Sequence, residues 1–272
     1  MEAVFLSFVA QTGKMDSVSP RKCSGCKNGA AFPHTLRTAF QPIYDLNDGS
    51  VFAYEALVRG ENGEGAAEML SLVNDENLYA FDQACRVAAI RQAVAAGLLD
   101  TRARLSINFM PNAVYSPMAC IQLTLKTARE VGLAEDRLIF ELTENERVDI
   151  DHVTEIVEAY RSLGFATAID DFGAGYAGLN LLANLRTDLV KLDMELVRGI
   201  DCSEPRRQIV YAIVRLCAEM GRQVIAEGIE TQGELEALQT MGIHLVQGFH
   251  LARPTLGHLA PPLSQQPMRL VG

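Results

Sequence analysis

The sequence contains no apolar run that approaches the ~18 residues of a membrane-spanning helix. Its first stretch, MEAVFLSFVAQTGK, is apolar only briefly and lacks the basic n-region and small-residue cleavage site of a signal peptide. We interpret this stretch as a docking segment or a disordered tail. With 49% hydrophobic and 21% charged residues, the chain has the composition of a soluble globular protein, and we expect it in the cytoplasm.

The chain also lacks an excess of positive charge. It carries 24 Lys and Arg residues against 34 Asp and Glu residues, a formal net charge of -10. Because such a chain repels phosphates at long range, we expect no broad DNA or RNA surface. A small phosphorylated ligand still fits if metal ions bridge the negative charges.

A second cysteine pair is missing as well. Cys23 and Cys26 form a C-x-x-C pair, but a structural zinc site usually needs four ligands, and only His34 lies nearby. The pair is therefore an exposed pair without a ligand, a redox-active pair, or half of a metal site completed across a dimer. The four other cysteines are expected to be buried or half-buried thiols: Cys85, Cys120, Cys202 and Cys217.

The 272 residues fit one large α/β domain. We expect an N-terminal extension over 1–35, a domain over 36–262 and a C-terminal tail over 263–272. The domain opens with two strand-like stretches, AFQPIYDL and SVFAYEALVRG, on either side of the turn signal Asn47, Asp48, Gly49. This pattern predicts an antiparallel β-hairpin.

Beyond the hairpin, apolar strands alternate with helical stretches. Helices are expected near 76–97, 117–132, 149–164, 204–221 and 231–241, and strands at RLSINF, RLIFELTE, FATAIDDF, DLVKLD, RQVIAEGI and HLVQGF. Near-continuous apolar strands between helices predict a parallel sheet that is buried on both faces. Eight strands in all favour a closed TIM-like (β/α)8 barrel with one antiparallel strand; an open doubly wound sheet is the alternative.

Nearly every predicted strand ends in an acidic or amide residue. The carboxyl ends of barrel strands converge on one rim, where active sites form. The strand-end residues are Glu55, Asn108, Glu141, Glu144, Asp170, Asp171, Lys191, Asp193, Glu227 and Gln247. Glu144 and Asp193 are alternatively helix caps or loop anchors, and Gln247 is alternatively a loop residue without a chemical role.

The rim would bring five carboxylates together with one lysine. Converging carboxylates shift their pKa values or repel one another unless a cation lies among them. All the candidate ligands are oxygen donors, with no His or Cys, which is the set that Mg²⁺ and Mn²⁺ prefer. We therefore predict two such ions, bridged by Asp170 or its neighbour and suited to water attack on a phosphodiester.

These residues occur in motifs that resemble the EAL-domain cyclic-di-GMP phosphodiesterases. EALVR at 55–59 looks like the signature that names the family. Seven further motifs follow the family's order around it: QPI at 41–43, IN at 107–108, ELTE at 141–144, DDFGAGY at 170–176, KLD at 191–193, EGIE at 227–230 and QGF at 247–249. The resemblance covers about residues 36–260.

The resemblance implies a TIM-like barrel with one antiparallel strand. It implies hydrolysis of one phosphodiester of the bacterial signalling nucleotide cyclic di-GMP, giving linear pGpG. It also implies two Mg²⁺ or Mn²⁺ ions, inhibition by Ca²⁺, and a homodimer.

Individual residues take roles through the same resemblance. Glu55, Asn108, Glu141 and Asp170 match the ligands of one metal, and Asp170, Asp171 and Glu227 match those of the other. Lys191 matches the lysine that orients the attacking water, and Gln247 matches a residue near that water. Arg59 matches a phosphate-contacting arginine, while Gln41 and Asp193 are expected to contact the substrate. Glu144 matches the glutamate that anchors the loop after the paired aspartates.

The loop after Asp171 departs from the family pattern. Ala174, Ala177 and Gly178 stand where relatives have hydroxyl residues, which removes side-chain hydrogen bonds and adds backbone freedom at Gly178. An active phosphodiesterase remains the principal hypothesis, because all metal positions and the lysine are filled. A catalytically silent cyclic-di-GMP receptor or interaction module is the alternative, and a barrel enzyme with another substrate is a minor one.

Overall fold

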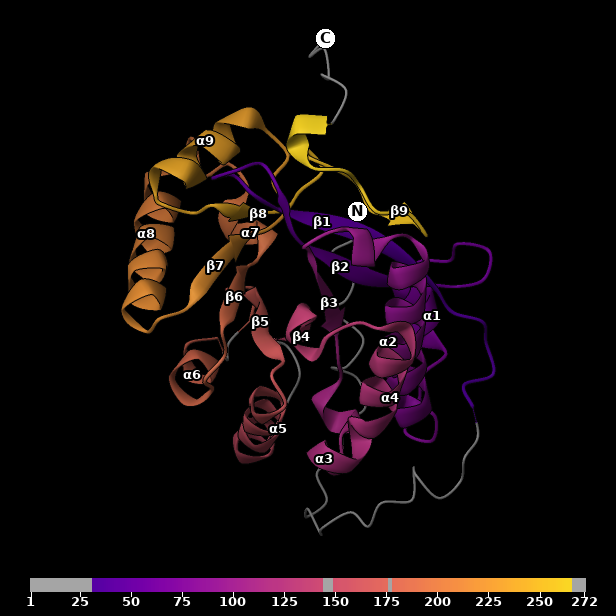
Figure 1. The fold of residues 1–272 in the computed structure, drawn as a ribbon. Coiled ribbons are helices and arrows are strands. Elements are labelled where there is room, and N and C mark those ends of the chain that lie inside the picture. The colour runs from indigo at the N-terminus through magenta and orange to yellow at the C-terminus, as the bar shows by residue number, and fades with distance from the viewer. Residues whose placement is uncertain (1–30, 144–148, 176–177, 266–272) are drawn as a thin grey trace.

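The computed structural model describes residues 31–143, 149–175 and 178–265, and within them the chain folds as a barrel (Figure 1). Glu144, Ala177, Cys23 and Cys26 lie outside the described residues. The strands are β1 Arg37–Asp45, β2 Val51–Arg59, β3 Arg104–Asn108, β4 Leu138–Thr143, β5 Ala166–Phe172, β6 Leu189–Leu192, β7 Gln223–Ala226, β8 Leu245–Val246 and β9 Thr255–Leu256.

Strand pairing closes β1 to β8 into a ring. From β2 to β8 each strand pairs in parallel with the next, whereas β1 pairs antiparallel with both β2 and β8. The short β9 adds to β1 at Ala39 and Phe40. The predicted barrel with one antiparallel strand is confirmed, and the open doubly wound alternative is wrong.

The opening hairpin forms where the turn residues predicted it. Asp45 Oδ1 accepts a hydrogen bond from the Asn47 N–H, and Asp48 Oδ1 accepts one from the Ser50 N–H. Gly49 has φ +72°, a left-handed conformation that costs glycine little. The turn sets the register in which Gln41 lies opposite Glu55 across the two strands.

Helices lie outside the ring of strands (Figure 1). They are α1 Ala66–Ser71, α2 Leu78–Ala95, α3 Pro117–Cys120, α4 Gln122–Val131, α5 Ile150–Ser162, α6 Gly178–Asn184, α7 Met194–Val197, α8 Glu204–Glu219 and α9 Gln232–Thr240. Short 3₁₀ turns cover Leu98–Asp100, Pro111–Ala113, Glu135–Arg137 and Leu263–Gln265. None of the described helices is both long and apolar enough to cross a membrane.

Helix α5 shows why such sequences become helices. The Asp149 side chain caps its first turn by accepting a hydrogen bond from the Asp151 N–H. Val153, Ile156 and Val157 recur at helical spacing, and all are buried against the barrel. This one apolar stripe attaches the helix to the barrel.

The structure differs from the sequence-based expectations in several short elements. Helices α1, α6 and α7 and strand β9 were not expected, and the helix expected over 117–132 is divided at Ile121. Cys202 is exposed, which contradicts the expected buried or half-buried thiol, because it lies in the turn that precedes α8. Cys120 and Cys217 are buried as expected.

Candidate active site

A layer of apolar side chains fills the interior of the barrel. It takes one buried residue from nearly every strand: Ile43, Ala53, Ile139, Ala168, Leu189, Ile225 and Leu245. Because side chains in a strand alternate between faces, the residue two positions nearer the rim also points inward. The apolar layer therefore forms the floor beneath the inward-facing side chains nearer the rim.

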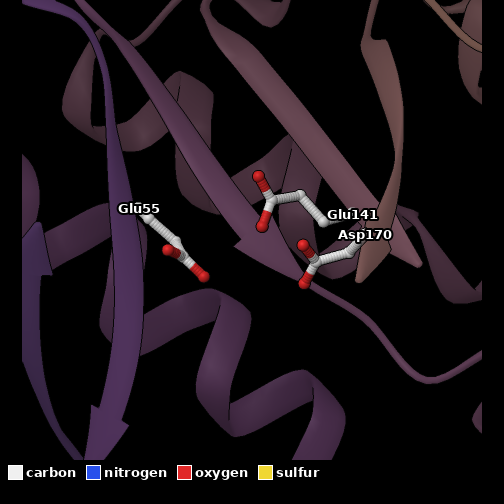
Figure 2. Close-up of side chains that lie close together, drawn as sticks. All are labelled: Glu55, Glu141 and Asp170. Atoms are coloured by element: carbon white, nitrogen blue, oxygen red, sulfur yellow. The ribbon is translucent and has the colours of Figure 1, made fainter. Parts of the chain in front are cut away.

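The residues two positions nearer the rim form a polar layer. Its members are Gln41, Glu55, Glu141, Asp170, Lys191, Glu227 and Gln247, together with Asn108, which lies two positions beyond Ser106 on β3. Gln41 precedes Ile43 in the chain because β1 runs in the opposite direction. Glu55, Glu141 and Asp170 come from three different strands and point toward a common space (Figure 2). The fold thus brings seven of the predicted strand-end residues together in one layer.

Lys191 lies at the centre of the carboxylates and is completely buried. Its Nζ atom is 2.8 Å from Glu141 Oε2, 2.8 Å from Asp170 Oδ1 and 2.7 Å from Glu227 Oε1. Glu55 Oε1 lies farther away, at 3.6 Å. Burial lowers the pKa of Lys191, but the carboxylates of Asp170, Glu141, Glu227 and Glu55 outweigh burial and hold it well above its ordinary value. The lysine therefore stays charged.

Amides and one hydroxyl group fix the carboxylates from the side. Asn108 Nδ2 donates to Glu55 Oε1 at 3.2 Å, and Gln247 Nε2 donates to Glu55 Oε2 at 2.7 Å. Ser106 Oγ donates to Glu141 Oε1 at 2.5 Å. Ser106 was not predicted as a site residue, although strand alternation places it on the same face as Asn108. Gln247 Oε1 is buried and has no hydrogen-bond partner among the described residues.

Asp171 reaches the same space although it neighbours Asp170 in a strand. Neighbouring residues normally face opposite sides of a sheet. The β5–β6 register shifts between Ile169 and Phe172, and Asp171 has φ +53°, a left-handed conformation that is rare outside glycine. This local distortion lets two consecutive carboxylates serve one site.

The carboxylates form two overlapping groups whose oxygens lie close enough together to hold metal ions. Oxygens of Glu55, Glu141 and Asp170 lie within 4.8 Å of one another, and so do oxygens of Asp170, Asp171 and Glu227. Asp170 belongs to both groups. Four carboxylates lie within 3.6 Å of the single ammonium group, and Asp171 adds a fifth carboxylate beside Asp170 and Glu227. All the donors are hard oxygens, so the residues present fit two Mg²⁺ or Mn²⁺ ions.

The pKa values show how strongly this site needs further positive charge. Burial raises the pKa of Glu141 to about 8, in opposition to Lys191. Burial and the neighbouring Asp170 charge raise the pKa of Asp171 to about 8 as well. Burial also raises the pKa of Glu227 well above its ordinary value. One lysine is therefore not enough to keep all these groups ionised near neutral pH.

Other predicted site residues lie around this centre. Gln41 is buried on β1 and donates from Nε2 to the Ala252 carbonyl oxygen at 3.2 Å. Asp193 caps α7 by accepting a hydrogen bond from the Glu195 N–H at 2.7 Å, as its helix-cap alternative predicted. Its contact with substrate stays a prediction.

An arginine-lined hollow of about 420 Å³ adjoins the rim. Arg59 and Arg253 line it, and the Arg253 guanidinium lies over the Phe249 ring at 4.3 Å from the ring centroid. The sequence resemblance pointed to Arg59 alone. Arg253 and Phe249 lie four residues apart after β8, and they line the hollow with Arg59 because β9, which follows them, pairs with β1.

Comparison with known sequences identifies a family. The family model described as EAL domain matches residues 32–254. The chain is 31% identical over 219 residues to the blue light- and temperature-regulated antirepressor BluF of Escherichia coli K12, covering 80% of this chain and 54% of that protein. It is 30% identical over 230 residues to the cyclic di-GMP phosphodiesterase NbdA of Pseudomonas aeruginosa, covering 80% of this chain and 29% of that protein. The chain therefore spans about half or less of these relatives' lengths.

Solved structures agree with the sequence comparison. A standalone versatile EAL protein from Vibrio cholerae O395 in its c-di-GMP bound form is 44% identical, with a TM-score of 0.82, and the match covers 87% of this chain and 100% of that one. Klebsiella pneumoniae BlrP1 in a manganese/cy-diGMP complex is 35% identical, with a TM-score of 0.77, over 84% of this chain and 58% of that one.

Proposed function

The chain belongs to the EAL domain family, and on that premise we propose that it hydrolyses one phosphodiester of cyclic di-GMP to give linear pGpG. The observation that carries the proposal is the pair of overlapping carboxylate groups around Lys191. Similar proteins are named as cyclic di-GMP phosphodiesterases or contain that nucleotide in their structures.

Two Mg²⁺ or Mn²⁺ ions are part of the proposal. Glu55, Asn108, Glu141 and Asp170 would hold one ion, and Asp170, Asp171 and Glu227 the other. When bound, such ions act as Lewis acids that stabilise negative charge on the phosphodiester and increase the acidity of a water molecule. The manganese complex of BlrP1 supports this choice. We propose that Ca²⁺ inhibits, because its larger and looser coordination fits catalytic geometry less well.

The chain's own residues would position the reactants. Lys191 donates hydrogen bonds from the centre of the site, so it orients the attacking water and offsets negative charge in the transition state. Gln247 has its Oε1 free to accept a hydrogen bond from that water. Arg59 and Gln41 would contact the nucleotide, Asp193 would contribute at the rim, and Glu144 would anchor the loop after β5. Water would attack phosphorus and form a new P–O bond while the P–O bond to a ribose oxygen breaks, and that departing oxygen would take up the proton that the water releases.

A product assay tests the proposal. Purified protein is incubated with cyclic di-GMP and Mg²⁺, Mn²⁺, Ca²⁺ or a chelator, and the nucleotides are separated by chromatography. We expect pGpG with Mg²⁺ or Mn²⁺ only. Lys191→Met should lose turnover, while Lys126→Met, which changes an exposed lysine on α4, should keep it. Nucleotide binding without product under every metal condition would refute the proposed activity.

A catalytically silent cyclic-di-GMP receptor is the second candidate. The similarity to BluF, which is named an antirepressor, favours it. Against it, every residue that matches a metal ligand of the family is present in the sequence, and so is Lys191. The product assay separates the two candidates directly.

The remaining proposals concern the setting of this activity. We propose that residues 36–262 form the catalytic domain, after an extension over 1–35 and before a tail over 263–272. Leu263, the first residue of that tail, donates its N–H to the Gly49 carbonyl oxygen, so the start of the tail contacts the turn between β1 and β2. We also propose a homodimer in the cytoplasm, which size-exclusion chromatography with light scattering and cell fractionation would test.

A further inference from the structure

A buried ion pair lies outside the barrel, between α2 and the strands that carry two of the candidate metal ligands. Arg86 is completely buried and Asp82 nearly so, and Arg86 Nε is 2.8 Å from Asp82 Oδ2. Burying two charges costs free energy that their attraction often fails to recover, so an apolar pair would serve packing at least as well. The pair therefore calls for an explanation beyond stability.

Asp82 connects α2 to the chain immediately after Asn108. Its second oxygen, Oδ1, accepts a hydrogen bond from the Met110 N–H at 3.0 Å. Phe109, between Asn108 and Met110, donates its N–H to the Glu141 carbonyl oxygen at 3.0 Å. Two consecutive backbone groups after the candidate ligand Asn108 are thus held in place, one of them by Asp82.

Arg86 contacts the outward-facing neighbours of two candidate ligands. Its guanidinium carbon lies 5.5 Å from the ring centroid of Phe109 and 5.3 Å from that of Phe140. Phe109 follows Asn108, and Phe140 precedes Glu141. Because strand neighbours face opposite sides, an outward ring that is held firmly fixes the backbone from which the inward ligand projects.

A hydrogen bond completes the support of Arg86. Its Nη1 atom donates to the Tyr160 hydroxyl oxygen at 2.8 Å, which ties the cluster to α5. The guanidinium also lies 5.8 Å from the Tyr160 ring centroid. The pair therefore connects α2, α5, β3 and β4 at one point outside the barrel, on the side of the strands opposite Asn108 and Glu141.

We propose that Asp82 and Arg86 are positioning residues, which hold Asn108 and Glu141 in the geometry of metal ligands from outside the barrel. The role rests on the proposed metal-dependent function, but it concerns the ligands' geometry rather than the reaction. Neither residue touches the reacting atoms. Their loss should weaken metal binding without removing any ligand.

The test compares Mn²⁺ affinity by titration calorimetry, without nucleotide, in the full chain and two double variants. Asp82→Leu with Arg86→Met removes both charges and the acceptor for Met110. Asp82→Asn with Arg86→Met removes both charges and keeps that acceptor. We expect the first to bind Mn²⁺ about 10- to 100-fold more weakly than wild type, as is typical for lost outer partners of metal ligands. The second should recover part of that loss.

Arg222→Met is the matched control. Arg222 is a buried arginine that donates from Nη2 to the Leu185 carbonyl oxygen, and it immediately precedes β7, at the end of the barrel opposite the site. Its loss should lower the melting temperature and leave Mn²⁺ affinity unchanged. In the Asp82/Arg86 variants kcat should fall with little change in KM for cyclic di-GMP.

Mn²⁺ affinities within twofold of wild type in both double variants would overturn the positioning role. If the Asp82→Leu/Arg86→Met protein does not fold, the Asp82→Asn/Arg86→Met protein is the test. A wild-type Mn²⁺ affinity in that variant would then overturn the positioning role. Wild-type protein that binds Mn²⁺ but leaves cyclic di-GMP intact would refute the proposed function only, because the affinities still test the positioning role. Wild-type protein that binds no Mn²⁺ would overturn both.

Discussion

Glu55 lies where donors from three strands and loops converge on one carboxylate. Asn108 and Gln247 donate to its two oxygens, and Lys191 approaches at 3.6 Å. The same group adds one more negative charge to a site that already has too many. Its contribution to stability and its contribution to metal binding therefore have opposite signs.

Glu55→Gln should separate these contributions. The amide keeps the shape and one acceptor oxygen but removes the charge, so a proposed metal ligand is lost while repulsion within the metal-free site decreases. We expect turnover to fall by more than the ~10- to 100-fold typical of losing an outer partner of a ligand. The melting temperature in chelator should stay the same or rise.

Calorimetric melting and the nucleotide assay check this expectation, with Glu61→Gln on the exposed loop after β2 as the control. A variant that melts several degrees lower in chelator yet turns over normally would show that Glu55 is a structural residue.

The raised pKa values predict how metal binding depends on pH. An unfolded glutamate ionises near its ordinary value of 4.5, whereas Glu141 in the metal-free fold keeps its proton up to about pH 8. The folded state therefore binds more protons than the unfolded state between these pH values, and metal-free stability should fall as pH rises through them.

Metal ions compete with those protons, so they should stabilise the fold more at higher pH. We expect the rise in melting temperature on adding Mn²⁺ to be larger at about pH 8.5 than at about pH 6. Scanning fluorimetry with chelator and Mn²⁺ arms measures it. An equal rise at both pH values would contradict proton competition at these carboxylates.

Most of the polar layer could be predicted from the sequence, because strand alternation places residues two positions apart on one face. Glu55, Glu141 and Lys191 follow this rule from Ala53, Ile139 and Leu189. Asp171 does not follow it, because its orientation depends on a left-handed backbone conformation that an aspartate in the sequence does not predict. The stack of Arg253 on Phe249 was equally hidden, because it depends on the path of a loop.

At the scale of elements, Gly248, directly after β8, allows the close approach of two segments that carry site residues. A Cβ atom on Gly248 would overlap the backbone of Ile229. Rotating a side chain could not remove this overlap, because the overlapping atoms belong to the backbone. Gly248 follows Gln247, and Ile229 lies two residues after Glu227. Close backbone approach between these two segments therefore brings Glu227 and Gln247 into the same layer.

Gly248→Ala should push the two segments apart. Overpacking against rigid backbone costs about 1–3 kcal/mol or more, so both melting temperature and turnover should fall. Gly65→Ala is the control, because an added Cβ there meets nothing within 4 Å and the backbone is ordinary for alanine. A Gly248→Ala protein with wild-type turnover would show that the close approach does not set the site.

Helices and strands whose apolar pattern repeats over many residues could be predicted from the sequence, whereas helices and strands of only a few residues could not. Helix α5 and strands β4 and β5 repeat their pattern over enough residues to be recognised. Helices α6 and α7 span seven and four residues, and β9 spans two, so tertiary contacts rather than sequence period decide them. The break at Ile121 could not be predicted for the same reason, because α3 has only four residues.

At the scale of the whole molecule, Leu179 is the large hydrophobic residue with the greatest exposure among the described residues, at 68%. It lies on α6, the helix that follows the paired aspartates. If the proposed homodimer uses this helix, Leu179→Glu should place a charge in the interface and lower the dimer fraction.

Sedimentation velocity measures that fraction, and Leu99→Glu, at an exposed position distant in the chain, is the control. A wild-type protein that is monomeric, or a Leu179→Glu variant that dimerises as well as wild type, would exclude α6 from the contact.

The reversed direction of β1 determines how additional chain could communicate with the site. Arg37 pairs with Arg59, so β1 begins at the rim, while the turn at Gly49, which follows β1, lies at the opposite end. In an all-parallel barrel the first strand begins at the end remote from the site. Here a sensory module fused ahead of β1 would join at the mouth of the barrel, next to the polar layer. Its movements would therefore reach the polar layer through the first residues of β1 rather than through the whole barrel.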